Sequence, residues 1–138
     1  MFQLDERLAA DTVEVARWHL CRILLMNEST YPWLILVPQR EGVTEIHHLD
    51  VSDQGQLMAE IARASKVIEA VSQPDKVNVA ALGNVVPQLH VHVVGRFRSD
   101  PAWPGAVWGR SDRKPYEPEA MEAMVNRLQY AIFNPLGE

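Results

Sequence analysis

Short apolar runs, in the pattern typical of β-strands, recur along the first two-thirds of the chain. The expected strands are Val13–Trp18 (VEVARW), Cys21–Asn27 (CRILLMN), Trp33–Pro38 (WLILVP), Lys76–Gly83 (KVNVAALG) and Gln88–Val94 (QLHVHVV). Turn residues in ESTYP and NVVP join the second strand to the third and the fourth to the fifth. The pattern therefore predicts two antiparallel hairpins.

Helical spacing replaces strand spacing in two places. Between Ser52 and Val71 apolar residues recur every three or four positions, which predicts a helix with Ser52 as N-cap, Asp53 in the first turn and Pro74 beyond its end. A second helix is expected at the C-terminus after Pro118. Strands followed by a long helix, more strands and a final helix predict an α+β domain with a mostly antiparallel sheet.

The last predicted strand carries polar side chains on one face only. Alternate residues of a strand share a face, so Gln88, His90 and His92 point one way, whereas the intervening apolar residues face the core. A solvated polar face, half of a metal site and a nucleophilic site all fit this pattern. A metal needs a further ligand, for which His47, His48 and Asp50 in IHHLD are the candidates.

Catalysis needs an imidazole that is neutral at working pH. The reference pKa of histidine is about 6.5, so most of His90 would be neutral at pH 7 and able to act as a nucleophile. Gly95, just beyond the histidines, would let the backbone approach a ligand closely. We therefore rank catalysis above metal binding.

The composition narrows the class of protein. A chain of 138 residues with 47% hydrophobic residues fits one domain, residues 1–138. The net charge of −5 argues against a nucleic-acid polymer as partner. One cysteine, Cys21, fits a reducing compartment, and we read no signal peptide in MFQLDERLAAD and no run that would span a bilayer. We expect a soluble cytoplasmic protein.

The segment GNVVPQLHVHVV resembles the signature of the histidine triad (HIT) superfamily of nucleotide hydrolases and transferases, which is usually His-φ-His-φ-His-φ-φ with φ apolar. The order hairpin, helix, strand, His-strand is similar as well, over a core of about residues 15–97. The loop and helix at 98–138 would then be a C-terminal addition. The resemblance implies a HIT-like fold, a homodimer formed by joined sheets, and nucleotide chemistry.

The same resemblance assigns roles to individual residues. His90 would attack the α-phosphorus and form a covalent nucleotidyl-histidine, and His92 would donate to the phosphate oxygens. Asn27 would hold the ribose hydroxyls, and Asn84 would lie near the phosphates. The walls of the base or ribose pocket would be formed by Ile23, Leu25 and Trp33, although Trp33 fits a core position equally well.

Three positions depart from the family pattern. Gln88 replaces the first histidine and cannot relay a proton, Val85 stands where several members have Ser or Thr, and Trp33 where common members have His. We expect a hydrolase or nucleotidyl transferase for a nucleoside phosphoramidate, a phosphoester or a dinucleoside polyphosphate. It would need no cofactor, with Mg²⁺ entering only on a polyphosphate substrate. A non-catalytic nucleotide-binding module is the alternative.

Overall fold

A single antiparallel sheet of five strands organises the chain. We analysed a computed structural model that describes residues 1–110 and 112–135, so residues 111 and 136–138 of the predicted C-terminal addition lie outside the described residues. The strands are β1 (Thr12–Arg17), β2 (Cys21–Met26), β3 (Trp33–Pro38), β4 (Lys76–Ala80) and β5 (Val91–Arg96). Their order in the sheet is β1-β2-β3-β5-β4. The predicted α+β class and both hairpins are confirmed.

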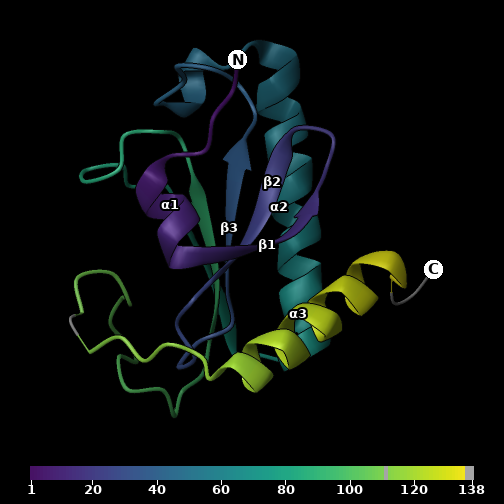
Figure 1. The fold of residues 1–138 in the computed structure, drawn as a ribbon. Coiled ribbons are helices and arrows are strands. Elements are labelled where there is room, and N and C mark those ends of the chain that lie inside the picture. Colours follow the sequence, from purple (N-terminus) through teal and green to yellow (C-terminus); the bar gives the residue numbers. More distant parts are fainter. Residues whose placement is uncertain (111, 136–138) are drawn as a thin grey trace.

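Among the described residues, three α-helices and one short 3-10 helix accompany the sheet. They are α1 (Glu6–Asp11), η1 (Ile46–His48), α2 (Val51–Ser72) and α3 (Pro118–Phe133). α2 runs along one face of the sheet, and α3 crosses the C-terminal part of α2 (Figure 1). The apolar residues Met124, Leu128 and Ile132 of α3 complete the core formed by α2 and the sheet.

The start of α2 differs from the sequence prediction by two residues. Asp50, not Ser52, is the N-cap, and its carboxylate accepts a 2.7 Å hydrogen bond from the amide of Asp53. Both residue types cap helices well, and the carboxylate one turn before Asp53 has the required reach. At the other end Gln73 adopts a left-handed conformation with φ of 50°, and Pro74 follows it, as predicted.

The last strand begins later than predicted. The strand pairing of β5 starts at Val91, so Gln88 and His90 lie in the segment that leads into it. Val91 and Val93 pack in the core beside α2, as does Leu89, which confirms the predicted inward face. Residues on the opposite face, among them Trp33 on β3 and Val94 on β5, pack against the N-terminal segment and the loop around Val107.

Gly95 serves packing, which corrects the expectation that it faces a ligand. A Cβ placed there would lie 2.7 Å from Cγ of Pro32 and 3.0 Å from Cγ2 of Ile68. The amide of Gly95 also donates to the carbonyl of Pro32 at 2.8 Å. The missing side chain therefore lets β5 approach α2 and the segment before β3.

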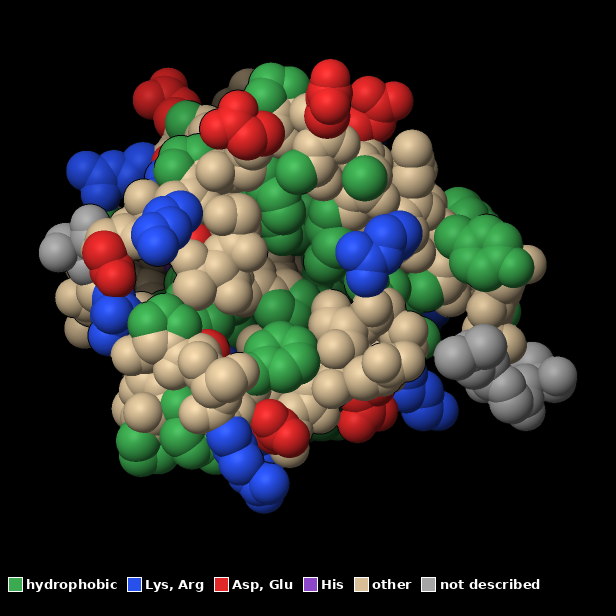
Figure 2. All heavy atoms as spheres, turned by 90° about the horizontal axis from the view of Figure 1, so that it is seen from below, with side chains coloured by type: hydrophobic (Ala, Val, Ile, Leu, Met, Phe, Trp, Pro, Cys, Tyr) green, Lys and Arg blue, Asp and Glu red, His purple; other side chains and the backbone are tan. Residues whose placement is uncertain are grey.

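Charged side chains of both signs are interspersed on the surface. The face seen from below shows acidic and basic groups around apolar patches, and its described residues form no continuous basic surface (Figure 2). In the part of the chain that the structure describes, none of the helices has the length and apolar character needed to cross a membrane.

Candidate active site

His90 is held in one tautomer by the backbone beside it. Its Nδ1 lies 2.7 Å from the carbonyl oxygen of Gln88, and the side chain is only 7% exposed. A carbonyl oxygen can only accept a hydrogen bond, so Nδ1 carries the proton and donates it. The lone pair of the neutral ring is then on Nε2, which is the atom a nucleophilic histidine uses.

His92 has the opposite tautomer. The indole Nε1 of Trp33 donates a 3.0 Å hydrogen bond to Nδ1 of His92, and both side chains are buried. An indole N–H can only donate, so Nδ1 of His92 is unprotonated and its hydrogen lies on Nε2. Burial, and secondarily the nearby charge of His90, lowers the pKa of His92 from 6.5 to about 4. His92 is therefore a neutral hydrogen-bond donor at pH 7.

The two imidazoles form an adjacent pair with complementary properties. Their ring centroids lie 5.0 Å apart with an interplanar angle of 69°. His90 presents a lone pair and His92 presents an N–H, so one group can attack an electrophile while the other donates to an oxygen bound to it. Trp33 is thus a partner of His92, a role that the sequence did not reveal.

Gln88 contributes its backbone, and its side chain points elsewhere. The side-chain oxygen accepts from the amide of Asp5 at 2.8 Å, and the side-chain nitrogen donates to the carbonyl of Gln3 at 2.8 Å. These bonds fasten the N-terminal segment over the site. The orientation of His90 depends on the main-chain oxygen of Gln88, which a residue of any type supplies.

The two asparagines predicted to bind nucleotide occupy different surroundings. Asn27 follows β2, and its side-chain oxygen accepts from the amide of Tyr116 at 2.8 Å. The carbonyl of Asn27 accepts from Nε of Arg113, so this residue anchors the segment before α3. Asn84 is exposed in the loop between β4 and β5. The structure therefore leaves these two side chains outside the His90–His92 contact.

Ile23 and Leu25 are not pocket walls, which corrects the prediction. Both are fully buried in the core on the α2 side of the sheet. Their neighbours Leu24 and Met26 point to the His92 side, and Met26 lines a cavity with His92. Nearly every residue of β2 is apolar, so the sequence does not show which alternate set faces the histidines, and a shift of one residue exchanges the faces.

Two small cavities adjoin the histidine pair. One of about 260 Å³ is lined by His92, Trp33, Tyr31 and Trp108, with basic residues at its edge. The other, of about 270 Å³, is lined by His90 together with residues of the loops at 44–47 and 81–83. His47, which the sequence could not place, belongs to this second cavity.

Tyr31 and Trp108 line the first cavity together with Trp33, and neither was predicted from the sequence. The indole of Trp108 lies 5.5 Å from the ring of His92 and 6.4 Å from that of Trp33, measured between centroids. Two tryptophans in DPAWPGAVWG were the only hint that this loop meets the site. The described residues contain no cluster of three His, Cys, Asp or Glu side chains that could hold a metal ion.

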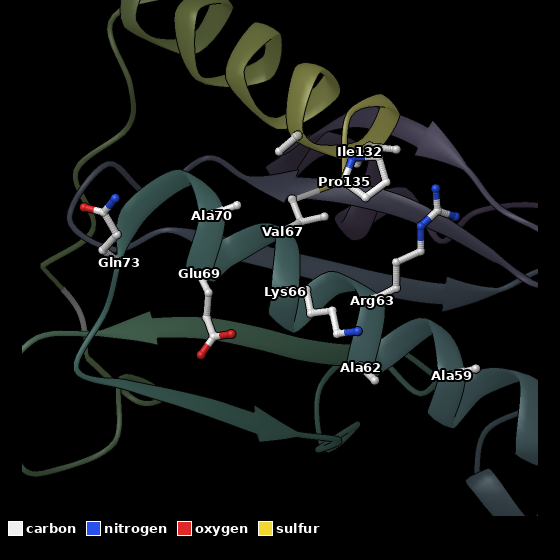
Figure 3. A pocket seen from close by; sticks show the side chains of 11 residues that line it. Ala59, Ala62, Arg63, Lys66, Val67, Glu69, Ala70, Gln73, Ile132 and Pro135 are labelled. Carbon is white, nitrogen blue, oxygen red and sulfur yellow. The ribbon is translucent and has the colours of Figure 1, made fainter. Parts of the chain in front are cut away.

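A further hollow lies elsewhere, between α2 and α3. It measures about 630 Å³, and short alanine side chains on α2 leave it open (Figure 3). Arg63 and Lys66 extend from α2 at this groove, and Ile132 and Pro135 approach from the α3 side. No histidine lines it among the described residues, so it is not the candidate active site.

The fold places His92 on β5 and His90 one residue before this strand, in a five-stranded antiparallel sheet. Comparisons with known proteins identify the family to which this arrangement belongs. The sequence profile of the HIT domain matches residues 7–99. The chain therefore belongs to the HIT domain family.

Solved relatives cover nearly the whole chain. A histidine triad protein from Marinobacter aquaeolei VT8 is 47% identical, with a TM-score of 0.93 over 96% of this chain and 97% of that one. A histidine triad protein from Bradyrhizobium japonicum is 40% identical, with a TM-score of 0.92 over 95% of this chain and 98% of that one.

A relative named for its activity is more distant. A protein of Mycobacterium tuberculosis described as AP-4-A phosphorylase is 36% identical over 96 residues, which are 62% of this chain and 47% of that protein. The chain thus spans about half the length of the curated relatives it matches.

Proposed function

We propose that this chain is a nucleotide hydrolase or nucleotidyl transferase that acts at the α-phosphate of a nucleoside phosphoramidate, a phosphoester or a dinucleoside polyphosphate. Membership of the HIT family and the phosphorylase relative support nucleotide chemistry. The observation that carries the proposal is the 2.7 Å contact between Nδ1 of His90 and the carbonyl of Gln88. It leaves Nε2 of His90 as a nucleophile beside the N–H of His92.

In the first step the Nε2 lone pair of His90 attacks the α-phosphorus. The bond from phosphorus to the leaving group breaks, and the leaving group departs with the electron pair. The resulting nucleotidyl-imidazole carries a positive charge, which the Gln88 carbonyl stabilises by accepting from Nδ1. The Nε2–H of His92 donates to a non-bridging phosphate oxygen, where negative charge increases in the transition state.

In the second step water attacks the same phosphorus. The new P–O bond forms as the P–N bond breaks, the electron pair returns to Nε2 of His90, and a proton from water passes to solvent. The product is a nucleoside monophosphate and the free enzyme. A transferase would use another acceptor in place of water. We propose no cofactor, and Mg²⁺ would act only as an ion bound to a polyphosphate substrate.

The nucleotide would lie across the His92 face of the sheet. We propose that Asn27 donates from its side-chain nitrogen to a ribose hydroxyl, since its oxygen is engaged by the amide of Tyr116. Asn84 is exposed and would contact a phosphate. Trp33 would act through His92, whose tautomer it holds.

The test is nucleotide release by wild type and His90→Ala. We expect His90→Ala to lower the rate by about a thousandfold or more, the scale on which loss of a catalytic nucleophile acts. His19→Ala is the matched control, because His19 is exposed in the turn between β1 and β2. Equal rates in wild type and His90→Ala would refute the proposal.

A non-catalytic nucleotide-binding module is the second candidate. The observation that favours it is Val85, 71% exposed and apolar, at a position where a hydroxyl would assist a leaving group. Such a module would bind nucleoside monophosphate and release no product from any of the three substrate classes.

We also propose a homodimer in the reducing cytoplasm, in which two sheets join through β4. This strand lies at one edge of the sheet and presents the half-exposed Val79. The opposite edge strand, β1, carries Glu14 and Arg17, and charged residues discourage edge pairing.

A further inference from the structure

The cavity beside His92 contains hydrogen-bond donors that the protein itself does not use. Tyr31 lines it and is only 4% exposed, yet its hydroxyl finds no hydrogen-bond partner among the described residues. The buried Nε1 of Trp108, which lines the same cavity, likewise lacks a partner in the described part of the chain. Leaving a buried donor unsatisfied costs about 1–3 kcal/mol, so each group favours a ligand that accepts from it.

Charged residues line this cavity. Arg110, Arg113 and Lys114 line it, against the two carboxylates of Glu28 and Asp112. The oxygens of Glu28 accept from the amides of Thr30 and Lys114, and Asp112 pairs with Arg110 at 3.0 Å. Arg113 pairs with Asp11 at 3.1 Å. Both carboxylates and both guanidinium groups therefore have partners, whereas the Lys114 ammonium makes no hydrogen bond with the described residues.

These features select an anionic ligand. An indole N–H can only donate, a phenol donates readily to a charged oxygen, and the cavity lining includes the ammonium of Lys114. A cavity of about 260 Å³ accommodates a small group and not a whole dinucleotide. The terminal phosphates of a substrate match this combination of size, charge and acceptor oxygens.

His92 connects this cavity to the proposed reaction. It lines the cavity, and its ring lies 5.0 Å from that of His90 on the other side. A substrate whose α-phosphate contacts both histidines therefore has its next phosphates within reach of Tyr31 and Trp108.

We infer that this cavity is a leaving-group subsite for the distal phosphates of a nucleoside polyphosphate, recognised by Tyr31, Trp108 and Lys114. The inference rests on the proposed function, since it selects one of its three substrate classes. When the bond between the α- and β-phosphates breaks, the electron pair goes to the bridging oxygen, and the subsite holds the added negative charge. No proton donor is then needed, which suits the apolar Val85.

The experiment compares two substrates and one probe. The kcat/KM of Tyr31→Phe is measured on a dinucleoside tetraphosphate and on a nucleoside phosphoramidate, and inorganic tripolyphosphate binding is measured by calorimetry. We expect the ratio of kcat/KM values to shift against the tetraphosphate by about 10-fold or more, the scale of a hydrogen bond to a charged group. Tripolyphosphate binding should weaken by a similar factor, and Tyr130→Phe, an exposed tyrosine on α3, is the matched control.

Folding and function are separable in this test. Tyr31→Phe removes an unsatisfied hydroxyl, so its Tm should equal or exceed that of wild type. Equal losses on both substrates, or tripolyphosphate binding that is absent or insensitive to Tyr31→Phe, would overturn the inference. If wild type turns over neither substrate but binds tripolyphosphate in a Tyr31-dependent manner, the subsite stands and the proposed activity fails.

Discussion

At the scale of single residues, the hydrogen bond from Trp33 determines which nitrogen of His92 carries the hydrogen. An indole N–H aimed at Nδ1 makes that atom an acceptor and leaves the Nε2–H for a ligand. A histidine at position 33 could change its protonation state, whereas tryptophan cannot. Trp33 therefore fixes the tautomer of His92 without titrating itself, while burial keeps His92 neutral at pH 7.

His92 should make the protein sensitive to acid. Its pKa is about 4 in the folded state and near 6.5 when unfolded, so the unfolded chain binds more protons between these values. The free energy of unfolding therefore falls as pH decreases from 6.5 towards 4. Between pH 7 and pH 4.5 we expect a loss of about 2–3 kcal/mol that His92→Gln does not show, measured by urea denaturation.

Asp100 does not obscure this comparison. Its pKa is lowered from 3.8 to about 2, first by the hydrogen bond from Arg96, so its contribution is lost only below pH 4. Identical pH slopes in wild type and His92→Gln would show that His92 is not held neutral by the fold.

Residue identity located the histidine pair but not the hydrogen-bond partners of the individual side chains. His90 and His92 follow from the spacing in QLHVHVV. The bonds from Gln88 to the N-terminal segment, and from Asn27 to Tyr116, join positions 83 to 89 residues apart. Such contacts depend on the tertiary arrangement of loops, which local sequence patterns do not encode.

At the scale of elements, the sequence predicted where the strands lie better than which of their side chains point to each face of the sheet. β2 and β3 are buried on both faces of the sheet, so nearly all of their residues are apolar. This composition predicts a strand, but it does not indicate which alternate residues point to which face. The segment from Gln88 to Val93 alternates polar and apolar residues, and there the inward face was predicted correctly. An alternation of polar and apolar residues indicates which face of a strand is buried, and the segment around Ile23 and Leu25 has no such alternation.

Gly95 tests how tightly β5 packs. A Cβ there would meet Pro32 and Ile68 at 3.0 Å or less, so Gly95→Ala should lower the free energy of unfolding by about 1–3 kcal/mol. Gly55→Ala on α2 is the matched control, since its Cβ would meet nothing within 4 Å. We expect this control to stabilise the protein by about 0.5–1 kcal/mol because alanine favours helix. Equal effects of the two substitutions, measured by urea denaturation, would contradict the close packing of β5.

At the scale of the whole molecule, one face of the sheet forms the main apolar core and the other face carries the histidine pair. α2 and α3 cover one face and supply the continuous apolar core. The other face carries the histidine pair and is covered by the N-terminal segment and the loop around Val107 and Trp108 (Figure 1). The layers follow from the order of helices and strands in the sequence. The position of the Trp108 loop cannot be predicted in this way, because the loop has no periodic pattern of apolar residues.

The oligomeric state tests the role of the β4 edge. Light scattering during size-exclusion chromatography should give twice the chain mass of 15.6 kDa. Val79→Lys places like charges at the proposed two-fold contact and should shift the protein towards monomer. Val51→Lys changes a residue that is 84% exposed on α2 and should have no such effect. A monomeric wild type, or a Val79→Lys protein that remains dimeric, would rule out assembly through β4.

The most direct test of the central claim is the mass of the protein during turnover. Wild type and His90→Ala are mixed briefly with a nucleoside phosphoramidate or a dinucleoside polyphosphate, quenched under mild conditions and measured by intact-mass spectrometry. We predict an added nucleotidyl group in wild type, mapped to His90, and none in His90→Ala. Rapid release of nucleoside monophosphate with no adduct, or an adduct that persists in His90→Ala, would contradict nucleophilic catalysis by His90.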